Sequence, residues 1–174
     1  MRFMYEKGDM IFYGSTGVYR VEGVGPVKHI RDCDPDRSYY QLTSLHGRET
    51  TYVPVDARTH MRPVMSRQEA ETLLDKVGGL QGQPCAARDT RALREYYQAL
   101  LSTHECLDLA SLIKAVDDKG KRAAREGKHL GKIDQEYKKR AERLLCEELS
   151  VSLELPYEQA QSVLSKAMGK GADS

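Results

Sequence analysis

The pattern of the sequence changes once along the chain, and this change constrains the fold more than any other feature. Up to about residue 55, short segments rich in β-branched and aromatic residues alternate with turn-forming residues, as is typical of short strands. From Ser66 onward, apolar residues recur with helical spacing. We therefore predict an α+β protein with a β domain over residues 1–64 and a helical domain over residues 65–174.

The amino-terminal part predicts a small antiparallel sheet. Turn-forming pairs such as Gly25-Pro26 and His46-Gly47 separate the strand-like segments. Short strands joined by short turns favour a small antiparallel β-barrel or half-barrel. A domain of about 60 residues is marginal when isolated, so we expect it to depend on the second half of the chain. The strands are expected over residues 10–13, 17–21, 39–42 and 50–53.

The carboxyl-terminal part predicts a bundle of five helices. Ser66 with Glu69, and Ser102 with Glu105, have the spacing of capping boxes, which are expected to open the first and third helices. Gly78, followed by a second glycine, is expected to end the first helix. The second helix is expected over residues 93–101, the fourth from near Asp134 and the fifth after Pro156.

Neither a signal peptide nor a membrane span is expected. The first ten residues carry four charged side chains, which interrupt any apolar signal core. No uncharged apolar run is long enough to cross a bilayer. We therefore expect a cytoplasmic protein.

The cysteines and histidines do not suggest a catalytic or metal site. The four cysteines lie far apart and form no C-x-x-C pair, which argues against a zinc ribbon or redox motif and favours free thiols in a reducing cytoplasm. His104 and Cys106 are close in sequence, a proximity that we interpret as chance. We expect no enzymatic activity, no metal and no cofactor; an enzyme or metal protein is the least favoured hypothesis.

Charge is unevenly distributed in a chain whose net charge is only +1. Residues 114–143 contain eleven basic and six acidic residues, which gives this segment a net charge of +5. Residues 144–174 contain two basic and five acidic residues, a net charge of −3. A basic segment of this kind suits contact with DNA phosphates, although a solvated helix face would have the same composition.

Three segments of the β domain form a recognisable series: residues 8–13 (GDMIFY), residues 17–21 (GVYRV) and residues 52–57 (YVPVDA). The helical domain adds residues 140–149 (RAERLLCEEL). In their order and spacing these segments resemble CarD-type transcription regulators. The resemblance covers nearly the whole chain, with an apparent insertion near residues 119–129. The β domain of this family is shared with the polymerase-binding module of the transcription-repair coupling factor.

The resemblance implies a mechanism. A Tudor-like amino-terminal domain would bind the β subunit of RNA polymerase, in part through an exposed strand edge. The helical domain would contact promoter DNA just upstream of the melted region and change the stability of the open complex. Binding to polymerase raises the effective concentration of a weak DNA binder, so strong intrinsic affinity for DNA is not required. The resemblance gives no oligomeric state; a monomer is favoured.

The expected DNA contacts depart from the family pattern at one position. Family members usually carry a tryptophan wedge at the start of the second helix; this chain has no Trp, and Asp89 occupies that position. A carboxylate cannot act as an apolar wedge and would be repelled by phosphate. Arg91, Arg94 and Lys114 do match basic positions of the family. The DNA-binding residues expected are Arg88, Arg91, Arg94, Lys114, Lys138 and Lys139.

The expected polymerase contacts lie around residues 48–54. An arginine of some family members falls at Tyr52, which can stack and hydrogen-bond but cannot form a salt bridge. Arg48 or Arg20 would be the residues to compensate for that lost charge, and ordinary strand packing is an equally good interpretation of Tyr52. The polymerase-binding residues expected are Arg48, Tyr52, Val53 and Pro54.

Two functions from different classes remain open. The first is a regulator that binds both polymerase and promoter DNA. The alternative is a polymerase-binding adaptor whose helical domain binds another protein instead of DNA. Asp89 and the missing tryptophan favour the adaptor, whereas the basic segment favours the regulator.

Overall fold

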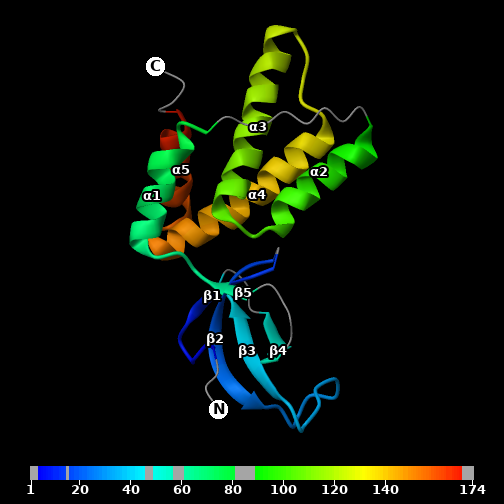
Figure 1. Cartoon of the computed structure of the whole chain (residues 1–174), viewed down its shortest axis with the longest axis vertical. Coiled ribbons are helices and arrows are strands. Elements are labelled where there is room, and N and C mark those ends of the chain that lie inside the picture. The colour runs from blue at the N-terminus through cyan, green and yellow to red at the C-terminus, as the bar shows by residue number, and fades with distance from the viewer. Residues whose placement is uncertain (1–3, 15, 46–48, 57–60, 81–88, 170–174) are drawn as a thin grey trace. The chain divides into compact units, whose positions relative to one another are not determined.

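The computed structural model describes residues 4–14, 16–45, 49–56, 61–80 and 89–169 of the 174. The chain divides into two compact units, Met1–Val64 and Met65–Ser174. The first unit contains all five strands and the second all five helices of the described residues (Figure 1). The predicted α+β class is therefore confirmed.

The strand unit is one antiparallel sheet with the order β4-β3-β2-β1-β5. Within the described residues β4 pairs only with β3 and β5 only with β1, so the sheet is not closed. The sequence predicted a barrel or a half-barrel, and this open sheet agrees with the half-barrel. Its strands are β1 (Met10–Tyr13), β2 (Gly17–Pro26), β3 (Ser38–Ser44), β4 (Thr50–Pro54) and β5 (Met61–Pro63).

The core of the sheet is built from cross-strand pairs. Tyr40 of β3 lies opposite Val53 of β4, and both side chains are buried. The Tyr5 ring packs edge-on against Tyr40 at 5.6 Å between ring centroids, and its hydroxyl donates to the Met61 carbonyl at 3.2 Å. Directly opposed pairs of this kind are the main units of sheet stabilisation. The buried cluster consists of Tyr5, Ile11, Tyr19, Val21, Tyr40, Leu42 and Val53.

Two features of the sheet were not predicted. Gly25-Pro26, expected as a turn, forms the end of β2, which is bent by a register shift between Val21 and Gly23. A bulge of this kind lets the strand continue past glycines, which in a sequence usually indicate a turn. Strand β5 has only three residues, too few for an alternating pattern, and it is held by pairing with β1.

The helical unit is organised around α4, which contacts each of the other four helices. Tyr137, Ala141, Leu144, Leu145 and Leu149 are buried along this helix, as the apolar periodicity predicts. None of the helices in the described part of the chain has the length and apolar composition needed to cross a membrane. The helices are α1 (Arg67–Val77), α2 (Thr90–Ser102), α3 (Cys106–Arg125), α4 (Lys132–Ser152) and α5 (Tyr157–Gly169).

One of the two predicted capping boxes is present. Ser66 accepts a hydrogen bond from the Glu69 amide at 3.1 Å, and the Glu69 carboxylate accepts from the Ser66 amide at 3.2 Å. The second prediction is wrong: Ser102 is the last residue of α2, and its hydroxyl donates to the Ala99 carbonyl at 2.8 Å. Because α2 runs on through Ser102, that side chain cannot cap α3, which begins at Cys106.

Candidate functional site

Among the described residues, strand β4 pairs only with β3, which leaves its other backbone edge without a strand partner. In the β3–β4 ladder, the Ser44 amide donates to the Glu49 carbonyl at 3.1 Å, and the Val55 amide donates to the Ser38 carbonyl at 3.0 Å. Hydrogen-bonded pairs alternate along an antiparallel ladder. Thr51 and Val53 therefore direct their backbone groups toward β3, whereas Thr50, Tyr52 and Pro54 direct theirs outward. Proline lacks an amide hydrogen, so the outward donors are Thr50 and Tyr52.

The polymerase-binding residues expected from the sequence occupy different environments on β4. Val53 is only 3 % exposed and belongs to the sheet core. Tyr52 lies opposite Gln41 and is half-buried; adjacent strand positions point to opposite faces, so it lies on the face away from the Val53 side chain. Pro54 is half-buried at the end of the strand. Arg48 lies outside the described residues.

An exposed ion pair lies close to the end of β4. Arg37 donates to the Asp56 carboxylate at 2.6 Å. This hydrogen bond and the guanidinium charge lower the pKa of the Asp56 carboxyl. The pair joins the segment before β3 to the segment after β4.

The start of α2 holds the residues that the sequence placed against DNA. Asp89 is the N-cap of α2, and its carboxylate accepts from the Ala92 amide at 2.7 Å. Asp89 therefore has a structural role that a tryptophan could not supply. Arg91 and Arg94 are both exposed, and Arg91 pairs with Glu95 one turn later at 3.3 Å. Arg88 lies outside the described residues.

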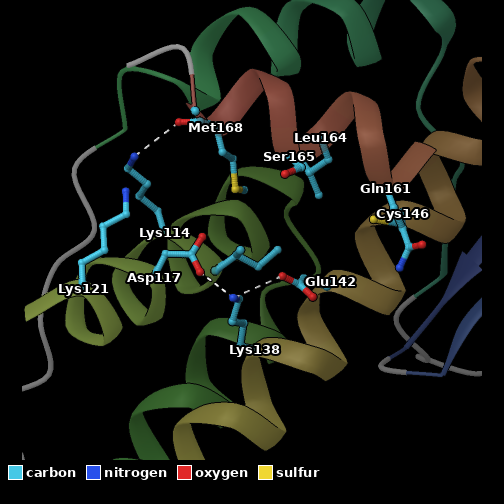
Figure 2. A pocket seen from close by; sticks show the side chains of 12 residues that line it. Lys114, Asp117, Lys121, Lys138, Glu142, Cys146, Gln161, Leu164, Ser165 and Met168 are labelled. Atoms are coloured by element: carbon cyan, nitrogen blue, oxygen red, sulfur yellow. Dashed lines mark hydrogen bonds and ion pairs between the residues drawn. The ribbon is translucent and has the colours of Figure 1, made fainter. Parts of the chain in front are cut away.

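Lys114 and Lys138 lie in a groove between α3, α4 and α5 with a volume of about 440 Å³ (Figure 2). Lys138 is bracketed by carboxylates, with Asp117 at 2.5 Å and Glu142 at 3.7 Å. Burial alone would lower the pKa of Lys138, but these two carboxylates outweigh it and raise the pKa. The ammonium is therefore charged but already neutralised, which makes it a poor phosphate ligand. Lys114 reaches the Met168 carbonyl at 3.5 Å.

Lys139 is exposed in a second hollow, between α4 and α5, that adjoins this groove. The two hollows share Glu142 and Gln161 in their linings. Arg91 and Arg94 line neither of them. The structure thus brings Lys114, Lys138 and Lys139 into one region and leaves the α2 arginines apart from it.

The net charge of residues 114–143 does not show which cations are already paired. Most acids of this segment are engaged by a lysine or arginine, such as Asp134 by Lys119 at 2.9 Å. Among the described residues, Lys121, Arg122 and Arg125 at the carboxyl-terminal end of α3 form no ion pair. Helical spacing could have shown which charges share a face, but not which of them meet an acid on another helix.

No cluster that could bind a metal is present in the described part of the chain, taking groups of three or more histidine, cysteine or acidic residues. Burial raises the pKa of the Cys146 thiol to about 12, so this side chain carries almost no thiolate at neutral pH. Within the described residues the sheet has two edge strands, β4 and β5, and exposed basic side chains lie on α2, α3 and α4.

Comparison with known protein families identifies the strand unit. Residues 5–65 match the family model described as the CarD-like/TRCF RID domain. The amino-terminal unit is therefore a domain of this RNA polymerase-interacting family, which supports polymerase binding and a role in transcription. The family resemblance noted in the sequence is confirmed for these residues. No curated protein matches the chain.

Proposed function

We propose that this protein is a transcription regulator that binds the β subunit of RNA polymerase and contacts promoter DNA upstream of the melted region. Through both contacts it changes the stability of the open complex. The observation that carries the proposal is the family match over residues 5–65, a unit whose β4 edge is free in the described structure. We propose a non-catalytic role that needs neither metal nor cofactor.

The polymerase contact proceeds by strand addition to β4. An exposed edge with outward amide and carbonyl groups is a ready template for an extended segment of another protein. Tyr52 supplies an outward amide and carbonyl at the middle of the strand, and its half-buried ring can pack against the incoming segment. Val53 supports this edge from the core rather than contacting polymerase itself.

One DNA contact uses the exposed guanidinium groups of Arg91 and Arg94. Both lie near the amino-terminal end of α2, where a helix dipole also favours a phosphate. Two arginines give little affinity by themselves. Attachment to polymerase makes the second contact intramolecular, so weak phosphate binding is sufficient.

The alternative, a polymerase-binding adaptor that does not touch DNA, is favoured by the acids on α2. Asp89 places a carboxylate at the helix start, and Glu95 engages Arg91. Together with Arg94, this surface carries two cations and two carboxylates and has no net charge. Such a surface suits a protein partner better than a phosphate backbone.

Charge reversal on α2 separates these two functions. We expect the variant Arg91→Glu with Arg94→Glu to reduce the promoter effect by at least about tenfold through phosphate repulsion, while polymerase binding is unchanged. The readout is open-complex lifetime on a fluorescent promoter, with polymerase binding measured in parallel. The matched control is Lys76→Glu with Lys166→Glu, which changes the net charge equally at exposed positions of α1 and α5. An unaltered promoter effect in the α2 variant would support the adaptor.

A further inference from the structure

The carboxyl-terminal end of α3 and the start of α4 form an exposed, strongly basic surface. It holds five cations and one carboxylate, Glu126, within residues 121–132. All five cations are exposed. Leu130 packs against Gly120, with Cδ1 3.1 Å from the position of an added Cβ, so the connection to α4 folds back along α3. We call this surface the basic end; it consists of Lys121, Arg122, Arg125, Lys128 and Lys132.

One of these five cations, Lys128, is in an ion pair within the surface, with its ammonium 3.7 Å from the Glu126 carboxylate. Among the described residues, no ion pair involves Lys121, Arg122 or Arg125. Lys121 and Arg125 are four apart on α3, a spacing at which like charges repel. The helix dipole favours a cation in the last turn of α3, but it disfavours Lys132, the first residue of α4.

We propose that the basic end binds the phosphate backbone of duplex DNA without reading its sequence. This inference rests on the proposed function, because the DNA is the promoter to which polymerase attachment brings the helical unit. Residues 121–125 extend over about 6 Å of helix axis, and duplex DNA carries one negative charge per about 1.7 Å of its own axis. Several unengaged cations can therefore meet phosphates at once.

The surroundings of the basic end argue for duplex DNA over other anionic partners. Residues 119–132 contain no Tyr, Phe or Trp, whereas proteins that hold single strands use aromatic rings to stack bases. Exposed large apolar side chains are absent from this part of the described structure; the two such residues of the described chain are Met4 and Leu107. Protein interfaces are usually anchored by aromatic or apolar groups, and membrane surfaces also require an apolar face.

The basic end is also better suited to phosphate than the other basic sites. Arg91 faces Glu95, and Lys138 is held between two carboxylates. Figure 2 shows Lys121 beside Lys114 on the same side of α3, so the basic end continues toward the groove. We therefore place the main phosphate contact at the end of α3 and a smaller one on α2.

The test is equilibrium binding of the full chain to a labelled duplex of arbitrary sequence, measured by fluorescence anisotropy over a salt series. The variant is Lys121→Gln with Arg122→Gln and Arg125→Gln, because glutamine keeps high helix propensity while removing charge. We expect about tenfold weaker binding at low salt. The plot of the logarithm of the binding constant against the logarithm of the salt concentration has a negative slope. This slope should become shallower by about 2 to 3, since each lost phosphate contact contributes about 0.9.

The matched control is Lys28→Gln with Lys76→Gln and Lys166→Gln, which removes the same net charge from exposed positions elsewhere. We expect its affinity to stay within about twofold of wild type. Equal weakening in both triple variants would overturn the proposal and leave only a net-charge effect. A wild-type chain that does not bind duplex DNA at low salt would also overturn it.

A parallel arm separates this proposal from the proposed function. Arg91→Gln with Arg94→Gln is compared with the basic-end variant in the open-complex assay. If the α2 variant loses the promoter effect and the basic-end variant binds duplex DNA like wild type, the basic-end proposal fails alone. If wild type binds duplex DNA through the basic end but does not change the open complex, the proposed function fails and the contact stands.

Discussion

Replacing Tyr52 by proline is expected to weaken binding to RNA polymerase by about tenfold or more while leaving the sheet folded. The Tyr52 amide points away from β3, so losing it breaks no bond within the sheet. The same loss removes an outward donor that an added strand would use, and the proline ring obstructs the edge. One backbone hydrogen bond contributes about 0.5–1.5 kcal/mol, and about 1.4 kcal/mol corresponds to tenfold in affinity. Binding to purified polymerase checks this result.

Two control variants make this test specific to the backbone edge. Tyr52→Thr keeps the outward amide and a strand-forming residue, so its affinity should fall less than that of Tyr52→Pro. Thr51→Pro removes an amide that points toward β3, and we expect it to destabilise the sheet instead. If Tyr52→Thr and Tyr52→Pro lose the same affinity, the side chain and not the strand edge carries the contact.

Replacing Glu148 by alanine should lower the free energy of unfolding of the helical unit by about 3 kcal/mol. The Glu148 side chain is fully buried and accepts the Met65 amide at 2.8 Å and the Cys106 thiol at 3.3 Å. Alanine leaves the amide unpaired, at a cost of about 1–3 kcal/mol, and opens a cavity. Alanine also removes the cost of keeping a carboxylate out of water, which offsets part of this loss. Urea unfolding followed by helical circular dichroism measures the change.

Glu136→Ala is the matched control on the same helix. Glu136 is exposed, and its ion pair with Arg140 is 3.9 Å long, so its loss should change stability by less than about 0.5 kcal/mol. Glu148→Gln keeps the volume and one acceptor, and we expect an intermediate loss of about 1–2 kcal/mol. A Glu148→Ala variant as stable as the Glu136→Ala variant would show that the buried carboxylate does not hold Met65 on α4.

The ends of α1 and the buried face of α4 could be predicted from the sequence. Ser66 and Glu69 cap α1 as their spacing indicates, and Gly78 ends that helix. The apolar periodicity of α4 correctly predicted Leu144, Leu145 and Leu149 as core. These features depend on residues within a few positions of one another, so a sequence contains all the information that they need.

Features that depend on distant partners could not be predicted in the same way. Glu148 is buried among the core leucines of α4, where it accepts the amide of Met65, 83 residues earlier in the chain. Lys138 is neutralised by Asp117 across two helices, whereas Arg122 at the end of α3 has no such partner among the described residues. The sequence alone does not distinguish Lys138 from Arg122 as a phosphate ligand. The ion pairs therefore favour the basic end over the groove lysines as a site for DNA.

The most direct test of the proposed function is open-complex formation by the cognate RNA polymerase on a fluorescent promoter, titrated with the full chain. Polymerase binding is verified in the same samples. We predict a saturable change in the population or lifetime of the open complex, reached at the concentration that saturates polymerase. Full occupancy of polymerase with no change in the open complex would contradict the regulator and favour the adaptor.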